Sequence, residues 1–274
     1  MKKSVNWVLS FFGLVVIRMP KWRLLVRLTP FLKVSSLVPQ SVVQQLAACI
    51  DKSHSQIGQD LVALVTSNFK KSGFFVEFGA TNGIDLSNTY LLEKEFSWTG
   101  ILAEPATFWQ SKLQMNRNCI LDFRCVTNKS GEQLDFLEVQ DVLNQSDSVE
   151  LSTLEEFADN GDWASKIRTG LRYKVETISL LDLLIEHDAP RFIDYISIDT
   201  EGSEFLILRD FDFSQFEFGL MSVEHNFTKR RTDLLNLLIL NGYVRIWNEI
   251  SEFDDWFVSQ GVYLDLARGG ILTA

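Results

Sequence analysis

The chain has 274 residues, 46% apolar and 23% charged, which is enough for one α/β domain with a full hydrophobic core. Its formal net charge of −10 argues against a protein held to nucleic acid by phosphate contacts. The three cysteines, Cys49, Cys119 and Cys125, have no metal-ligand spacing, so we expect no zinc site and a cytoplasmic location.

The charge is unevenly distributed along the chain. Residues 1–50 contain seven basic residues and no acidic one, and the remainder has a net charge of −17. Residues 5–17 are apolar but shorter than the roughly 20 residues that span a bilayer. We therefore expect an N-terminal helical extension, residues 1–50, whose residues 1–33 lie on an anionic membrane surface at its cytoplasmic face. The alternative is a helix that packs on the domain or on a partner.

Proline and serine residues at positions 30, 35, 36 and 39 predict a linker between this extension and a domain at residues 51–274. Residues 42–50 and 60–69 are expected to be helical. The polar segment 53–59 between them precedes the first strand, where it can fold over a ligand, which makes Gln56, Gln59 and Asp60 candidates for ligand contact. The alternative is a solvated loop, with Asp60 as a favourable charge at a helix N-terminus.

Residues 74–88 predict a buried strand, a glycine turn and the start of a helix, which is the opening of a nucleotide-binding α/β sheet. The turn contains only small or left-handed-tolerant residues, so its backbone N–H groups can approach a ligand closely. The predicted cofactor contacts from this stretch are Gly79, Ala80, Asn82, Gly83 and Asn88, the last also a candidate helix cap.

Glu77 distinguishes this turn from a dinucleotide site. A carboxylate at the end of the strand would repel a pyrophosphate, whereas it suits a cation such as S-adenosylmethionine, which carries an ammonium and a sulfonium. The alternative is an ordinary turn with a solvated glutamate.

Residues 100–105 predict a second buried strand that ends at Glu104 and Pro105, followed by a helix over residues 107–116. Glu104 lies 25 residues after Gly79, close to the interval expected for a carboxylate that accepts hydrogen bonds from ribose hydroxyls. Residues 120–127 and 134–139 are expected to form further strands. Residues 140–174 are rich in acids and predict either a specificity insertion or a disordered acidic loop.

The remaining pattern alternates strands and helices. We expect a strand and helix over residues 175–187, a central strand over 195–199, a helix to residue 211, a strand over 219–223 and a helix over 234–240. Residues 244–250 and 261–266 are expected to be antiparallel strands at the sheet edge.

Four predicted strands end in acids: Glu77, Glu104, Asp199 and Glu224. Because ligands of parallel α/β sheets lie across the carboxyl ends of the strands, these acids are expected to border one crevice for a cation-bearing nucleotide. His225 is the first candidate for the general base and Asp199 the second; the alternative for His225 is a hydrogen-bonded structural role. Asp199, Glu224 and Asn226 also offer oxygens to a divalent metal, although no metal site is predicted.

Several of these segments together resemble the FkbM family of S-adenosylmethionine-dependent methyltransferases. They are SQIGQD (55–60), FFVEFGATNGIDLSNTYLLEKEFSWTGILAEPA (74–106), YISIDTEGSEF (195–205) and SVEHN (222–226). The resemblance implies a class I methyltransferase fold: Rossmann-like, seven strands, mostly parallel, one antiparallel edge strand and helices on both faces. It also implies methyl transfer to a hydroxyl oxygen of a sugar or a secondary metabolite.

Carried over by position, the resemblance places Glu77, Gly79, Ala80 and Gly83 in the cofactor turn, Glu104 on the ribose and Asp199 beside the reacting methyl. The middle glycine of the commoner turn is Thr81 here. Two other functions remain open from sequence: an NAD-dependent oxidoreductase, and a non-catalytic module recruited to membranes.

Overall fold

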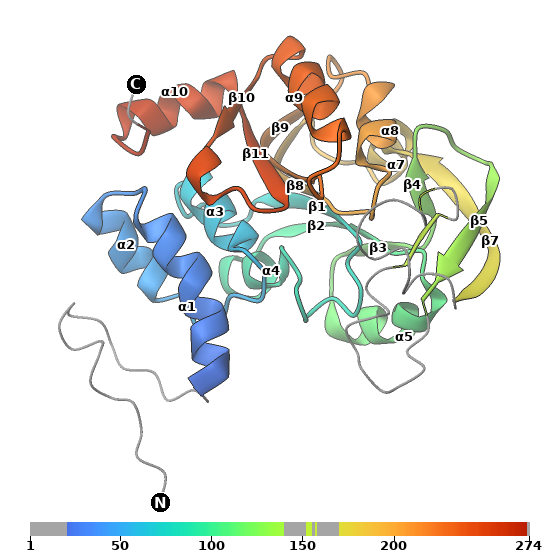
Figure 1. Cartoon of the computed structure of the whole chain (residues 1–274), viewed down its shortest axis with the longest axis horizontal. Helices are drawn as coiled ribbons and strands as arrows, with labels where there is room; N and C mark the ends of the chain where they lie inside the picture. Colours follow the sequence, from blue (N-terminus) through green and yellow to red (C-terminus); the bar gives the residue numbers. More distant parts are fainter. Residues whose placement is uncertain (1–20, 140–151, 155–156, 158–169, 273–274) are drawn as a thin grey trace, which may run out of the picture.

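The computed structural model describes residues 21–139, 152–154, 157 and 170–272, and its central feature is a seven-stranded sheet (Figure 1). In spatial order the strands are β10 (Tyr243–Ile246), β11 (Asp254–Ser259), β9 (Glu217–Glu224), β8 (Phe192–Ile198), β1 (Phe74–Phe78), β2 (Thr99–Ala103) and β3 (Ile120–Asp122). Only β11 is reversed, pairing antiparallel with both β9 and β10. The predicted Rossmann-like sheet is confirmed, with its reversed strand next to the edge strand β10.

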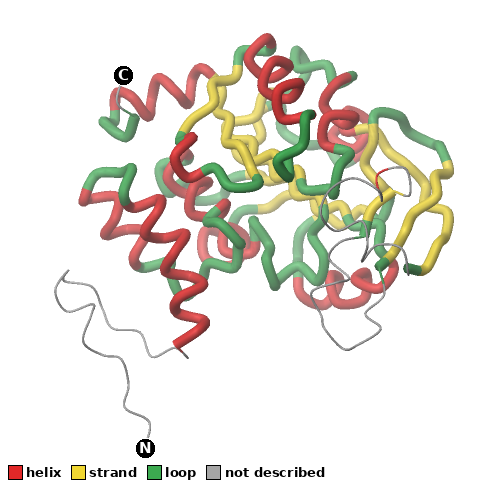
Figure 2. Tube along the Cα trace, in the orientation of Figure 1, coloured by secondary structure: helices red, strands yellow, loops and turns green. Residues whose placement is uncertain are grey.

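The alternation of side chains along the strands builds a hydrophobic core on each face of the sheet. In β1, Phe75 belongs to one core and Val76 to the other. The strands lie between helices in Figure 2. The helices are α3 (Gln59–Thr66), α4 (Tyr90–Phe96), α5 (Thr107–Asn116), α7 (Leu180–Glu186), α8 (Glu204–Arg209), α9 (Arg230–Leu240) and α10 (Gln260–Arg268). Leucines of α3, α4 and α10 enter the first core, and those of α7, α8 and α9 the second, so helices cover both faces as expected.

Two N-terminal helices, α1 (Lys21–Ser35) and α2 (Gln40–Ala47), pack on the first core through Phe31, Val34 and Leu46. The linker prediction is wrong, because Pro30 lies inside α1 and Pro39 directly precedes α2. Pro30 also lies against Gly58, the residue before α3: a Cβ atom added to Gly58 would lie 3.1 Å from the Pro30 Cβ.

The apolar stretch 5–17 lies outside the described residues. Within the described part of the chain, no helix has the length and hydropathy to cross a bilayer.

A second sheet lies beyond β3, at the end of the molecule opposite α1 and α2 (Figure 1). Its order is β4 (Cys125–Thr127), β7 (Leu171–Ser179), β5 (Gln133–Glu138) and β6 (Thr153–Leu154). The single strand expected over residues 120–127 is therefore wrong. Asp122 accepts a hydrogen bond from the Arg124 N–H, and this tight turn separates β3 from β4. Most of the predicted insertion 140–174 lies outside the described residues.

The strand expected over residues 261–266 is also wrong, because these residues lie in α10. The Ser259 hydroxyl accepts from the Val262 N–H and caps the helix. The reversed strand is instead β11, which was not predicted because its two initial aspartates, Asp254 and Asp255, hide the alternation of a buried strand.

Candidate functional site

Strand register places four acidic side chains along the carboxyl edge of the parallel strands. Phe78 pairs with Ala103 of β2 and with Ile198 of β8, and Ile198 pairs with Val223 of β9. The residues one position further on therefore lie side by side. Asp254 of β11 joins them, because it pairs directly with Glu224. We call Glu104, Asp199, Glu224 and Asp254 the acidic row; Gly79 lies within it, between Glu104 and Asp199.

Gly79 cannot be replaced without moving the backbone. Its φ is +73°, and a Cβ there would lie 2.2 Å from the Asp199 carbonyl oxygen. The ends of β1 and β8 thus approach each other closely, and nothing projects from Gly79 into the row. Ala80, the next residue, is buried with a small side chain. Small residues at positions 79 and 80 are what the close approach of the β1 and β8 ends requires.

The rest of the turn is held by its own side chains. The Asn82 amide oxygen accepts from the N–H groups of Ile84 and Asp85, at 2.8 and 2.9 Å. Gly83 has φ +78°, and a Cβ there would lie 2.7 Å from side-chain carbons of Leu113 and Arg117. Asn82 and Gly83 therefore shape the turn and its packing against the end of α5.

Glu104 connects the second strand to the glycine turn. Its carboxylate accepts from the Thr81 N–H and the Ala106 N–H, both at 2.8 Å, and the side chain is buried. Burial raises its pKa to about 7, with the charges of Glu138 and Asp199 acting in the same direction. Each oxygen retains capacity for a further donor, as ribose hydroxyls would supply. Pro105 is partly buried beside it.

Glu77 is not directed at a ligand. Its carboxylate accepts from the Asn88 N–H at 2.7 Å and from the hydroxyls of Ser87 and Thr89. Its Oε2 also lies 3.7 Å from Arg117 Nη1. With these partners Glu77 anchors the segment before α4, so the hypothesis that it holds the donor's ammonium is not supported by the geometry.

Arg117 is a buried cation that the sequence did not indicate. It forms an ion pair with Glu93 at 2.6 Å and donates to the Gly83 carbonyl oxygen and to the hydroxyls of Ser87 and Thr89. It thus fixes both sides of the glycine turn. Its five partners lie between residues 77 and 93, at least 24 positions before it, so no motif around Arg117 marks it.

Asn88 is buried and contacts β8. Its Nδ2 donates to the Ser197 hydroxyl at 2.9 Å, and its Oδ1 has no partner among the described residues. Asn88 therefore presents one unsatisfied acceptor at the level of β8 and does not cap α4, whose N-cap is Thr89.

The negative charge of the acidic row is concentrated around Asp199. One oxygen from each of Asp199, Glu201 and Glu224 lies within 4.8 Å of the others. Burial raises the pKa of Asp199 to about 7, and the charges of Glu204 and Glu77 add to the rise while contact with Glu224 opposes it. Burial also raises the pKa values of Glu224 and Asp254. In both cases the negative charge of Asp199 is the second largest cause of the rise.

His225 does not meet the requirements of a general base. Its ring is fully buried, its Nδ1 accepts from the Phe227 N–H at 3.0 Å, and its Nε2 lies 3.8 Å from Asp255 Oδ1. Burial lowers its pKa to about 4. The structural alternative therefore fits, since His225 supports the Asn226–Phe227 turn, where both residues have positive φ. Asp199 is the remaining base candidate.

The segment before α3 borders the site, and Gln59, the first residue of α3, contacts the acidic row. Asp60 is buried and accepts from Ser53, His54 and Ser55, so it holds the segment and is not available as a ligand contact. Gln56 is exposed. Gln59 donates to Asp254 Oδ2 at 3.0 Å and is the residue that reaches the acidic row.

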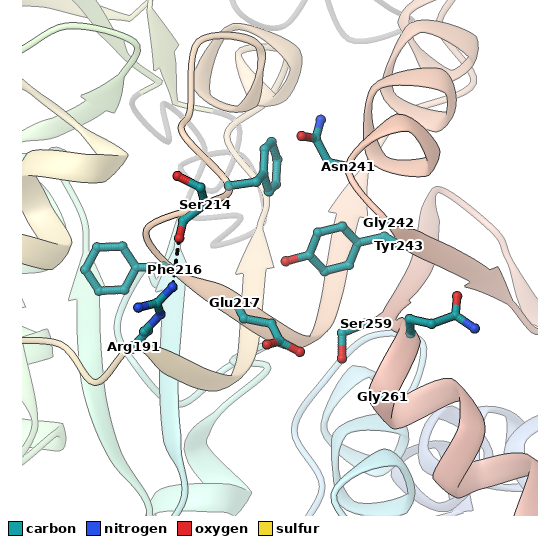
Figure 3. A pocket seen from close by; sticks show the side chains of 11 residues that line it. Arg191, Ser214, Phe216, Glu217, Asn241, Gly242, Tyr243, Ser259 and Gly261 are labelled. Carbon is teal, nitrogen blue, oxygen red and sulfur yellow. Dashed lines mark hydrogen bonds between the residues drawn. The ribbon is translucent and has the colours of Figure 1, made fainter.

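A separate pocket of about 290 Å³ lies at the opposite edge of the sheet (Figure 3). It is lined by Glu217 at the start of β9, Tyr243 at the start of β10 and Ser259 at the end of β11. These are the amino ends of the parallel strands, so this pocket is not the nucleotide site.

Comparisons with known proteins identify the family of the chain. A family model described as "Methyltransferase FkbM domain" matches residues 77–261, more than half of the chain. The search of curated proteins returned no match.

Two solved structures are similar to the chain at 10% identity. The precorrin-6y C5,15-methyltransferase of Geobacter metallireducens matches with a TM-score of 0.35 over 73% of this chain and 86% of its own. A methyltransferase of Pyrococcus furiosus matches with a TM-score of 0.32 over 91% and 90%.

Proposed function

The chain belongs to the FkbM methyltransferase family, and we propose that it transfers the methyl group of S-adenosylmethionine to a hydroxyl oxygen of a sugar or a secondary metabolite. The observation that carries this proposal is the acidic row with Gly79 inside it. A row of carboxylates, three of them buried and Asp199 partly buried, without an ion-paired lysine or arginine among the described residues favours a ligand that brings positive charge.

The residues present fit this donor. Glu104, which accepts from the Thr81 and Ala106 N–H groups, would accept further hydrogen bonds from the ribose hydroxyls, and Gly79 places no side chain beside it. When bound, the cofactor would supply a methyl group that its sulfonium makes electrophilic. Asp199 would stabilise the neighbouring positive charge through its own negative charge.

We also assign to Asp199 the role of general base that removes the proton of the acceptor hydroxyl. Asp199 lies in the acidic row, whereas His225 contacts Phe227 and Asp255. The protein's main contribution is then to hold donor and acceptor in line. An NAD-dependent oxidoreductase is disfavoured by the family match.

The direct test is calorimetric titration with S-adenosylhomocysteine. The wild-type protein is expected to bind it, and Glu104→Ala to bind at least about tenfold more weakly, since two charge-assisted hydrogen bonds are lost. Glu132→Ala, at an exposed glutamate directly before β5, is the matched control. A wild-type protein that does not bind S-adenosylhomocysteine would contradict the proposal.

The acceptor class is tested separately. The protein is incubated with methyl-labelled donor and with glycan, lipid and small-molecule extracts of the host, and the labelled products are identified by mass spectrometry. Label on a nitrogen, carbon or sulfur atom instead of a hydroxyl oxygen would contradict O-methyl transfer while leaving the methyltransferase assignment intact.

A further inference from the structure

Phe227 lies exposed in the turn that follows β9. Its side chain is 73% exposed. A single exposed apolar side chain is ordinary on a protein surface, so exposure alone indicates no ligand. The unusual feature is the backbone, because the φ of Phe227 is +54° and that of the preceding Asn226 is +40°. Residues other than glycine rarely adopt this left-handed conformation, and for a bulky residue it is unfavourable.

Packing offsets the same conformation elsewhere in the chain. Asn68 and Phe69, which follow α3, have φ values of +52° and +53°. The Phe69 ring is partly buried against the first hydrophobic core, so its burial offsets the unfavourable backbone. The Phe227 ring has no comparable burial. Its conformation therefore gains little stability from its own side chain in the folded protein, and a role in binding accounts for its retention.

Hydrogen bonds from the surrounding residues hold this turn in place. The Phe227 N–H donates to His225 Nδ1 at 3.0 Å, and the Thr228 N–H donates to the His225 carbonyl oxygen at 2.8 Å. The N–H groups of His225 and Asn226 donate to the Phe253 carbonyl oxygen. The rings of Phe227 and His225 form a T-shaped contact, with their centroids 5.4 Å apart. Such a contact covers at most one face of the phenyl ring, so the other face is open.

The strand order places Phe227 beside the part of the site that is left for an acceptor. This step rests on the proposed function, in which Glu104 would hold the donor's ribose and Asp199 would lie beside its methyl group. Glu104 follows β2 and Asp199 follows β8, so the donor would extend over β2, β1 and β8. The body of the acceptor must then lie beyond Asp199, over the ends of β9 and β11. Phe227 follows β9 by three residues, and its turn is hydrogen-bonded to Phe253, which directly precedes β11.

The chemistry of the turn fits a sugar ring. A pyranose presents C–H groups on its face and hydroxyls around its edge, and the C–H groups are attracted to the negatively charged face of an aromatic ring. Hydrogen-bonding side chains lie next to Phe227 in the sequence, since Asn226 and Thr228 are partly exposed and Lys229 is exposed.

We propose that Phe227 stacks on a sugar ring of the acceptor and so places one of its hydroxyls toward Asp199 and the donor's methyl group. The ring is already fixed in direction by the turn, so little conformational freedom is lost when the sugar binds. Phe227 would thus select a sugar over an acceptor that has no face of C–H groups.

The test compares full-length Phe227→Gly with the wild type. Glycine adopts a φ of +54° without steric cost, so this variant loses the ring and is expected to remain folded. Phe227→Tyr retains the ring and tests whether an aromatic residue restores the contact. Leu240→Ala, which removes an 85% exposed apolar side chain at the other end of α9, is the control.

Methyl transfer from methyl-labelled S-adenosylmethionine is measured against increasing concentrations of a glycan extract of the host. Phe227→Gly is expected to raise the apparent KM for this extract at least about tenfold, with a smaller change in the maximal rate. Phe227→Tyr is expected to stay within about threefold of the wild type, because it keeps the aromatic face. Leu240→Ala is expected to match the wild type. Calorimetric binding of S-adenosylhomocysteine is expected to be unchanged in every variant.

The outcomes separate this inference from the proposed function. If Phe227→Gly keeps the wild-type KM while the wild type binds S-adenosylhomocysteine, the stacking contact is refuted and the methyltransferase proposal stands. The same holds if no label enters the glycan extract while another extract is methylated. Loss of S-adenosylhomocysteine binding in Phe227→Gly would also refute the contact, because the ring would then act on the donor side. A wild type that does not bind S-adenosylhomocysteine would overturn both proposals.

Discussion

The pKa of Glu104 gives a quantitative test of how the site is built. It is about 7 in the folded protein against an ordinary value of 4.5. One pKa unit corresponds to about 1.4 kcal/mol, so ionising this buried side chain weakens folding by about 3 kcal/mol at most. Between pH 4.5 and 7 the folded protein holds the proton more tightly than the unfolded chain. This contribution to stability is therefore complete below pH 4.5 and is lost as pH rises to 7.

The assay is urea unfolding of the wild type and Glu104→Gln from pH 4.5 to 8. The measured quantity is the free energy of unfolding of the wild type minus that of the variant. It is expected to fall by up to about 3 kcal/mol across this range. Contributions of titrating groups that do not interact with Glu104 cancel in the difference, as does the constant cost of placing an amide beside two backbone N–H groups.

Glu132→Gln makes the same change on the protein surface and serves as the control. A wild-type minus Glu104→Gln difference that stays constant within about 1 kcal/mol would show that Glu104 is ionised throughout, and the account of its burial would be wrong.

Three further predictions follow from the surroundings of the row. Gly79→Ala forces a Cβ to within 2.2 Å of a carbonyl oxygen at φ +73°, so we expect a loss of about 3 kcal/mol or more in stability and of S-adenosylhomocysteine binding; near-normal calorimetry would contradict this. Arg117→Met leaves Glu77 and Glu93 without their buried cation and is expected to cost about 3 to 5 kcal/mol in urea unfolding, so a change below about 1 kcal/mol would count against its role. His225→Gln is expected to retain methyl transfer. Because burial lowers the pKa of His225 to about 4 from 6.5, the wild type should lose stability relative to this variant as pH falls from 6.5 to 4; a folded variant without activity would restore His225 as the base.

Local patterns were sufficient to predict the centre of the fold. β1, β2, β8 and β9 are buried apolar runs, and a parallel sheet places their carboxyl ends at one edge, which is why Glu104, Asp199 and Glu224 were expected together. Asp254 was not predicted, because it is the first residue of a reversed strand. A reversed strand reaches this edge of the sheet with its first residue, whereas the parallel strands reach it with their last.

Side-chain roles were harder to predict, because they depend on partners distant in the sequence. Glu77 has the position of a ligand contact, yet Arg117 and the residues before α4 occupy it. His225 has the position of a base, yet its environment is set by Asp255 from the neighbouring strand and by the turn that follows it. Asp60 was expected to contact a ligand, yet its carboxylate accepts hydrogen bonds from the segment that precedes it.

The contact between Pro30 and Gly58 links the N-terminal helices to the chemistry. Gly58 directly precedes Gln59, and Gln59 holds Asp254 in the acidic row. A shift of α1 would thus be transmitted to Asp254 through two contacts, Pro30 with Gly58 and Gln59 with Asp254. The packing of α1 against Gly58 therefore bears on the position of one carboxylate of the row.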